Sequence, residues 1–297
     1  MKNKKFLNTS EVATLLNINE KKVYVLAQEG VIPATKSMGK WLFPYEELLN
    51  FLKYDALKNI KKGLPFTLLE QNILLAAGSD DPILPKIFSE FYKFSSTTLF
   101  YSTVGSEQGI GMLKNRIVHF AFSHLYNVEE GSFNIPFLKK FFFSDDYAVI
   151  NLFYRDIGLV SNFKINDLTE LESKKLKFVL RQKGSGIRNI TEWFFDTGKL
   201  QQNWFDFYTN EVSRHFDVAG LVKENQDFIG ITTKNVSQTF NLYFYPLFKE
   251  QFDVITLKEY FFSQSFQNFY RFLSENLKEK FSNLNGYDFN STGKILI

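Results

Sequence analysis

The chain contains no cysteine, and this absence excludes several kinds of site. Without thiols it has no disulfide, no thiolate-bound zinc, no iron–sulfur cluster and no cysteine nucleophile. Only three histidines occur in 297 residues, so a metal centre built from several histidines is not expected. No apolar run approaches the roughly 18 residues of a membrane-spanning helix, and no apolar signal segment follows the basic N-terminus. We therefore expect a cytoplasmic chain with no membrane partner, no bound metal cation and no resident cofactor.

The overall composition is that of a folded protein. Hydrophobic residues make up 44% of the chain and charged residues 23%, which is enough apolar material for a sizeable core. Domains usually span about 100 to 200 residues, so this length favours two or three domains. Dominant disorder is excluded.

Positive charge is concentrated at one end of the chain. Residues 1–62 carry 11 lysines against six acidic residues, a net charge of +5, whereas the remainder carries 24 basic against 26 acidic residues. A small basic module on a neutral body is typical of a nucleic-acid-binding head, although a solvated lysine-rich face has the same composition. The local pattern must decide between the two.

The pattern of residues 8–30 predicts two short helices joined by a turn. Asn8 and Glu11 stand in capping-box positions at the start of the first helix. Residues 17–19 interrupt the apolar periodicity, and a second helix follows from about residue 20 to 29. Gly30 then suits the left-handed position after a helix end. Two β-prone runs around the basic segment 35–40 add a hairpin, so the stretch is a winged helix-turn-helix.

Residues 6–52 resemble the excisionase-type helix-turn-helix domain, a relative of the MerR winged-helix heads. The resemblance is carried by TSEVA, by V-Y-x-L-x-x-E-G-x-I-P-A and by G-K-W-L-F-x-x-E-E-L. It implies binding to double-stranded DNA through a recognition helix and a wing. The residues it places there are Lys21, Lys22 and Tyr24 on the helix and Lys36 and Lys40 on the wing. Trp41 is better explained as a core residue, because Leu42 and Phe43 follow it on a short strand. The predicted boundaries are 1–53 for this domain and 54–65 for a connecting helix.

Beyond residue 65 the pattern predicts an α/β body with largely parallel sheets, because apolar β-like runs alternate with helical periodicity. Three strand-to-helix corners present a glycine and a serine: Gly78-Ser79, Gly105-Ser106 and 184–186. Glycine allows close approach of a ligand to the backbone, and a serine hydroxyl can donate to an oxyanion beside the free amides of a helix start. A single corner of this kind is more often a simple helix cap.

Residues 73–297 resemble the cytoplasmic sensor domains related to periplasmic molybdate- and tungstate-binding proteins, which occur fused to DNA-binding heads in bacterial regulators. The resemblance implies a type II periplasmic-binding-protein fold: two α/β lobes joined by crossing strands, with the ligand between them. The body would span 66–297, with lobe one at about 66–149 and 252–297 and lobe two at about 151–245. The hinge strands would cross at 150–154 and 241–246. The matching phrases are LAAGSDDPIL, STVGSEQGIGMLKN, FAFSHLYNVEEGSFNIPFLKKF, VINLFYRDIGLV, FVLRQKGSGIRNI, YFYPLFKEQFDVI and NGYDFNSTGKI.

The same resemblance implies a set of ligand-binding residues between the lobes. The set is Ser79, Ser106, His124, Ser185, Gly186 and Arg188. A guanidinium at position 188 suits a carboxylate or another bidentate anion, unless it is a solvent-facing helix arginine or part of an interlobe salt bridge. His124 faces either the ligand or a core, while His119 and His215 are assigned to structure or surface. Asp80 departs from the family phrase, where a neutral residue is expected, and its charge would oppose a dianion.

These observations predict a DNA-binding transcriptional regulator, a homodimer on two half-sites, whose two-lobed domain senses a small anion. Molybdate or tungstate is the effector that the resemblance implies. An organic acid or another small molecule remains open, as does an excisionase-like protein that binds DNA without a ligand. Because a G-x-S-x-G elbow, a P-loop and a histidine cluster are all missing, the chain is not expected to be an enzyme.

Overall fold

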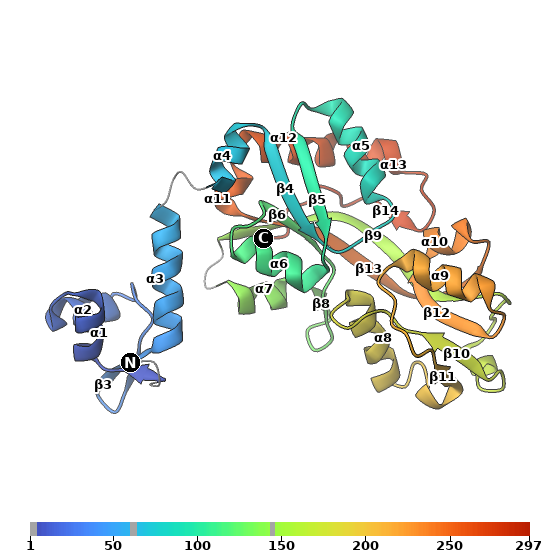
Figure 1. Cartoon of the computed structure of the whole chain (residues 1–297), viewed down its shortest axis with the longest axis horizontal. Helices are drawn as coiled ribbons and strands as arrows, with labels where there is room; N and C mark the ends of the chain where they lie inside the picture. Colours follow the sequence, from blue (N-terminus) through green and yellow to red (C-terminus); the bar gives the residue numbers. More distant parts are fainter. Residues whose placement is uncertain (1–4, 60–63, 143–145) are drawn as a thin grey trace. The chain divides into compact units, whose positions relative to one another are not determined.

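The computed structural model describes residues 5–59, 64–142 and 146–297 (Figure 1). The chain divides into two compact units, a head up to Gly63 and a body from Leu64 to Ile297. The predicted linker 54–65 includes residues 60–63, which lie outside the described residues. Within the described ranges, no helix combines the length and apolar character needed to cross a membrane.

The head has the predicted winged helix-turn-helix fold. The capping box is confirmed, because the Glu11 amide donates to Asn8 Oδ1 over 2.9 Å and the Asn8 amide donates to Glu11 Oε2 over 3.0 Å. Asn17 adopts a left-handed conformation with φ of 53°, which ends the first helix and begins the turn. The elements are β1 (Phe6–Leu7), α1 (Thr9–Leu16), α2 (Glu20–Gln28), β2 (Thr35–Ser37), β3 (Lys40–Pro44) and α3 (Tyr45–Asn59).

The three head strands pair antiparallel in the order β1-β3-β2. Their sheet and the two short helices enclose a core that includes Val12, Val23 and Phe43, all fully buried. Trp41 packs against this core, as the sequence predicts, and Lys36 Nζ lies 5.9 Å from its ring centroid.

The body is built on one mixed sheet whose strands follow the order β11-β10-β12-β9-β13-β6-β4-β5, with β14 added beside β9. Its two longest strands, β9 and β13, are paired antiparallel along their length. The prediction of largely parallel sheets is therefore wrong at the centre, where β9 leaves one lobe and β13 returns to it. Parallel pairs flank this centre. The bounds are β4 (Ile73–Gly78), β5 (Thr98–Thr103), β6 (Phe120–Ser123), β9 (Tyr147–Ser161), β10 (Leu176–Val179), β11 (Phe205–Phe207), β12 (Phe228–Thr233), β13 (Tyr243–Leu257) and β14 (Tyr287–Asp288).

Helices cover the sheet at both ends, and a short hairpin of β7 (Tyr126–Asn127) and β8 (Ser132–Phe133) extends from the first lobe (Figure 1). The first-lobe helices are α4 (Leu64–Glu70), α5 (Leu84–Phe94), α6 (Ser106–Lys114), α7 (Ile135–Phe141), α11 (Lys258–Phe261), α12 (Gln264–Phe272) and α13 (Lys278–Phe281). The second-lobe helices are α8 (Gly186–Asp196), α9 (His215–Glu224) and α10 (Lys234–Thr239).

The body has two lobes, because its buried hydrophobic residues form separate cores. The first-lobe core is rich in phenylalanine, and the second lobe has two smaller clusters. Along β9 the change of core falls between Phe153 and Ile157, and along β13 it falls between Leu247 and Phe252. The crossing on β9 overlaps the end of the predicted hinge segment 150–154, whereas the crossing on β13 lies after the predicted segment 241–246. An apolar run signals a buried strand without showing which core buries it.

Glycine allows backbone contact where the first-lobe sheet meets α6. A Cβ on Gly109 would lie 2.6 Å from Gly78 Cα, and a Cβ on Gly78 would lie 2.2 Å from the Phe122 carbonyl oxygen. Gly78 also has φ of +139°, which side chains disfavour. Strand β4 is thus held against both α6 and β6 just before Ser79.

Two alanine substitutions in α6 test this packing. Gly109→Ala should lower the free energy of unfolding by about 1–3 kcal/mol, because backbone atoms cannot move aside as a flexible side chain would. Gly111→Ala on the same helix meets nothing within 4 Å and should change stability by at most about 1 kcal/mol, in the stabilising direction. Urea unfolding of both variants measures the difference; equal stabilities would contradict the close contact.

Candidate functional site

The head presents the predicted DNA-binding residues to solvent. Lys21, Lys22 and Tyr24 are exposed on α2 around the buried Val23, and Lys36 and Lys40 are exposed on the hairpin of β2 and β3. The Lys22 amide donates to Asn19 Oδ1 over 2.8 Å, which fixes the start of α2. A helix with an exposed basic start beside a basic hairpin suits contact with DNA phosphates.

In the body, the three glycine–serine corners have different local roles. Ser79 directly follows β4, Ser106 is the first residue of α6, and Ser185 is the N-cap of α8. Only Ser185 caps its helix through its side chain, accepting the Arg188 amide over 3.2 Å. All three serines are buried, with at most 7% of their surface exposed.

A chain of side-chain hydrogen bonds begins at the first corner. Ser79 Oγ lies 2.5 Å from His124 Nε2, and His124 Nδ1 lies 2.7 Å from Glu250 Oε1. The His124 amide donates to Ser106 Oγ over 3.3 Å, so the second corner joins the same group. The His124 ring stacks on Phe252 with centroids 5.4 Å apart. His124 therefore faces the serine corners and not the hydrophobic core alone.

Arg155 supplies the cation of this group. Its Nε and Nη2 atoms each lie 2.6 Å from Glu250 Oε2, and Nη1 pairs with Asp81. The Asp81 carboxylate also accepts from the Tyr287 hydroxyl over 2.8 Å. The Arg155 and Glu250 side chains are fully buried on directly paired positions of β9 and β13. We call Ser79, Asp81, His124, Arg155 and Glu250 the crossing cluster, because it lies where the strands change lobes.

In the crossing cluster, burial and neighbouring charges shift the pKa values of Glu250 and His124 in opposite directions. Burial raises the pKa of Glu250, but the Arg155 guanidinium and His124 outweigh it and hold that pKa below its usual value. Burial lowers the pKa of His124 despite the neighbouring Glu250 carboxylate. At neutral pH the cluster therefore contains an ionised Glu250 and a neutral His124.

The second lobe meets this cluster at the start of α8. A Cβ on Gly186 would lie 2.3 Å from His124 Cε1, so the α8 backbone packs directly on the imidazole. Glycine is needed there because any side chain would collide with His124. The third glycine–serine corner, 184–186, thus packs against the His124 ring that contacts the other two corners.

Arg181 is the charged group that the second lobe adds. It lies two residues after β10, is 7% exposed, and donates from Nη2 to the Ser213 carbonyl over 2.7 Å. Its Nε and Nη1 atoms are buried without a hydrogen-bond partner among the described residues. Burial, reinforced by the Arg155 charge, lowers the pKa of Arg181 to about 10, so it remains protonated at neutral pH. Its charge in turn lowers the pKa of His124, which places both groups in one electrostatic environment.

Comparison with known families agrees with this two-lobed arrangement. Residues 89–274, more than half of the chain, match the PBP superfamily domain. The chain belongs to the PBP superfamily. Residues 6–53 match a helix-turn-helix domain, which identifies the head. Among curated proteins, the uncharacterized protein YvgK of Bacillus subtilis (strain 168) is 28% identical over 307 residues, covering 97% of this chain and 96% of YvgK.

Solved structures of the PBP superfamily fold are similar to the body. The effector-binding domain of QuiR in complex with shikimate has 18% identity and a TM-score of 0.50, covering 67% of this chain and 94% of that one. An ABC-type phosphate transport receptor from Vibrio cholerae has 15% identity and a TM-score of 0.51, covering 72% and 99%. A putative phosphate ABC transporter substrate-binding protein from Clostridium perfringens has 13% identity and a TM-score of 0.52, covering 66% and 90%. At these identities the likeness establishes the fold alone.

Arg188, which the sequence analysis selects as the ligand-binding cation, is already paired elsewhere in this PBP domain. Its Nε lies 2.7 Å from Glu192 Oε1, its Nη1 lies 2.7 Å from Glu211 Oε1, and Nη1 also donates to the Arg181 carbonyl. Both acidic partners belong to the second lobe, so Arg188 forms salt bridges within that lobe and not an interlobe salt bridge. The structure instead brings Arg181, seven residues earlier, to the lobe interface.

The other two histidines are buried structural residues. His119 Nδ1 accepts the Leu75 amide over 2.8 Å, and its Nε2 lies 2.9 Å from the Pro65 carbonyl oxygen. His215 begins α9, and its Nδ1 lies 3.1 Å from Thr232 Oγ1. Burial together with the Arg181 charge holds the pKa of His215 well below the usual value.

Sequence reasoning missed Arg155, Arg181 and Glu250. A signal was present for two of them, since Arg155 and Glu250 belong to short charged segments, Arg155-Asp156 and Lys249-Glu250, that interrupt the apolar runs of two strands. Charges inside a buried strand require a partner, so such positions are candidates for a polar network. Nothing in the local sequence indicates that their partners are each other.

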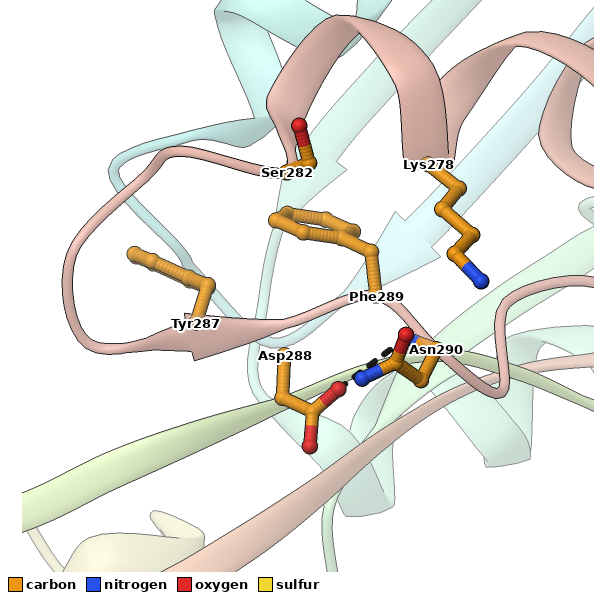
Figure 2. A pocket seen from close by; sticks show the side chains of 6 residues that line it. All are labelled: Lys278, Ser282, Tyr287, Asp288, Phe289 and Asn290. Atoms are coloured by element: carbon orange, nitrogen blue, oxygen red, sulfur yellow. Dashed lines mark hydrogen bonds between the residues drawn. The ribbon is translucent and has the colours of Figure 1, made fainter.

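A separate surface pocket of about 150 Å³ lies between α13, with Lys278 and the following Ser282, and the segment 287–290 (Figure 2). Asp288 at its floor accepts from the Asn290 amide over 3.0 Å and from Lys249 Nζ over 2.8 Å. Because this carboxylate is already paired, the pocket offers less for a charged ligand than the lobe interface does.

Removal of the Arg155 guanidinium should destabilise the protein strongly. Arg155→Met leaves the Glu250 and Asp81 carboxylates buried without their cation, and we expect a loss of about 3–5 kcal/mol in unfolding free energy. Lys249→Met, which breaks the partly exposed pair with Asp288, is the matched control and should cost no more than about 1 kcal/mol. Urea denaturation followed by circular dichroism measures both, and a similar small loss in the two variants would refute the structural role.

Proposed function

We propose that this protein is a transcriptional regulator whose PBP domain binds a small anion at Arg181 and thereby alters operator binding by the head. The head and the PBP domain together supply a DNA-binding part and a small-molecule-binding part. Arg181 carries the proposal, because it is a buried cation at the lobe interface, and two of its nitrogen atoms have no hydrogen-bond partner in the described part of the chain. Buried donor atoms without hydrogen-bond partners are costly, and a bound anion would supply acceptors for both nitrogen atoms.

Hydrogen-bond donors around Arg181 support an anionic ligand. Ser106 and Ser185 each accept a backbone N–H, which leaves their own O–H groups free to donate. The helices that begin at these corners, α6 and α8, direct the positive ends of their dipoles and their first-turn amides toward the same interface. Two kinds of donor, serine hydroxyls and backbone amides, thus accompany the guanidinium, and the helix dipoles add to its positive potential.

The resemblance implies molybdate or tungstate as the ligand, but the charges around Arg181 favour a singly charged carboxylate. The carboxylates of Asp80, Asp217 and Glu250 act on Arg181 and stabilise its charged form. Their negative charge would repel a second charge on the ligand. We therefore place an organic acid ahead of a tetrahedral dianion.

Regulation requires that the ligand bind two conformations of the protein unequally. Contacts from Ser106 in one lobe and Arg181 in the other would favour a closed arrangement of the lobes. We propose that this change is passed to paired heads in a homodimer on two half-sites, since a small head makes few phosphate contacts by itself. The proposal includes binding without chemical conversion of the ligand.

Arg181→Met tests the ligand site. Wild-type protein should be stabilised by about 2.7 kcal/mol at a hundredfold excess of a ligand over its Kd, and the variant should show no such shift. Arg188→Met should keep the full shift, because its guanidinium is paired with Glu192 and Glu211. Both variants should bind DNA like the wild type. Thermal-shift measurements with molybdate, tungstate, phosphate and a series of carboxylates provide the readout.

Two results would change the proposal. A shift lost in Arg188→Met and retained in Arg181→Met would return the anion to the position that the sequence analysis selects. If no compound in the series raises the thermal stability of the wild type, and DNA binding is intact, the result would favour an excisionase-like protein that acts without a ligand.

The head is tested by replacing adjacent lysines. The double variant Lys21→Ala/Lys22→Ala should bind DNA more weakly, and the slope of log K against log salt should fall by about 0.9 for each DNA phosphate that the variant no longer neutralises. Lys139→Ala/Lys140→Ala, an exposed lysine pair on α7 of the body, is the matched control and should bind normally. Fluorescence anisotropy over a salt series measures the slope, and equal slopes in the two doubles would exclude α2 from the interface.

A further inference from the structure

We propose that the ligand of the PBP domain must carry a hydrogen-bond donor, an O–H or N–H group, in addition to its anionic group. The donor would bind the Ser79 oxygen, while the anionic group binds Arg181. This inference rests on the proposed function, because it specifies the ligand of the same site. It follows from the direction of each hydrogen bond in the crossing cluster.

The direction is set first at Glu250. Arg155 has only donors, and its Nε and Nη2 atoms both lie 2.6 Å from Glu250 Oε2, so this carboxyl group is an ionised acceptor. The other oxygen, Oε1, lies 2.7 Å from His124 Nδ1. An ionised carboxylate can only accept, and therefore His124 Nδ1 carries the proton.

The protonation of His124 then determines the direction of the hydrogen bond with Ser79. His124 is buried, which lowers its pKa and keeps the ring neutral, so a proton on Nδ1 leaves Nε2 as a bare acceptor. Ser79 Oγ lies 2.5 Å from this nitrogen. The Ser79 hydroxyl must therefore donate its single proton to His124.

Ser79 consequently differs from the other two serines. Ser106 and Ser185 accept backbone amides and keep a proton to give, whereas Ser79 has given its proton and presents only lone pairs. An oxygen of tungstate or molybdate placed against Ser79 would meet lone pairs with no proton between them. A hydroxyl or ammonium group would complete the bond. A site built to hydrogen-bond such a group rejects the analogue that lacks it.

The order Ser79–His124–Glu250 also matches that of a serine nucleophile, its base and an orienting acid. In that arrangement Ser79 would attack an ester or amide carbonyl after passing its proton to His124. The two roles differ in what happens to the ligand, which is recovered unchanged if Ser79 is only an acceptor. The experiment below separates them.

Matched pairs of acids test the proposal on the wild-type full-length protein. The pairs are lactate with propionate, malate with succinate, 3-hydroxybutyrate with butyrate and 3-hydroxybenzoate with benzoate, with tungstate and molybdate measured alongside. In each pair that binds, calorimetry should show the hydroxylated member binding about tenfold or more tightly, the effect of one buried hydrogen bond. In Ser79→Ala this difference should disappear, whereas the exposed control Ser282→Ala should retain it.

The outcomes separate this inference from the proposed function. If no acid or oxyanion binds, or if binding survives Arg181→Met, the proposed function itself fails. If binding depends on Arg181 but propionate, succinate or tungstate binds as tightly as the hydroxylated acids, only the acceptor role of Ser79 fails. Hydrolysis of p-nitrophenyl acetate by the wild type, lost in Ser79→Ala, would make Ser79 a nucleophile and overturn the inference.

Discussion

The Arg155 guanidinium controls the geometry of the lobe interface. It bonds across the crossing strands to Glu250 and into the loop after β4 through Asp81, and it lies 4.9 Å from the centroid of the Phe252 ring. Because Glu250 is held ionised by Arg155, the proton of His124 is confined to Nδ1, and the orientation of Ser79 follows. The Arg155–Glu250 ion pair lies where the two cores meet. Through the two hydrogen bonds from Glu250 to His124 and from His124 to Ser79, it determines whether the Ser79 hydroxyl donates or accepts.

The interface combines a satisfied polar network with an unsatisfied cation. Within the crossing cluster the Arg155 guanidinium and the hydrogen bonds compensate for the burial of Glu250, whereas burial still raises the pKa of Asp81. Arg181 has no such compensation at Nε and Nη1 from the residues that the structure describes. Arg181 forms no salt bridge with the residues that the structure describes, so an anion bound there would not have to break one. Arg188, in contrast, would have to give up Glu192 and Glu211.

Local sequence signals predicted the head well, since the Asn8–Glu11 capping box and the hairpin before Phe43 involve residues close along the chain. The glycine–serine corners were also identified, because strand ends and helix starts are local features. The pairing of Arg155 with Glu250 spans 95 positions, and its only local sign is that charged residues interrupt the apolar runs of both strands. The choice between Arg181 and Arg188 likewise depends on Glu211, which only the folded chain brings within reach.

The separation of the cores along the crossing strands has a consequence for synthesis of the chain on the ribosome. The first-lobe core combines residues up to Phe153 with residues from Phe252 onward, whereas the second lobe is one uninterrupted insertion. Domains generally fold as units while the polypeptide emerges. The core of the first lobe therefore stays incomplete, with its phenylalanine side chains exposed, until the whole insertion and β13 have left the ribosomal exit tunnel. The lobe that begins first along the chain is the one completed last.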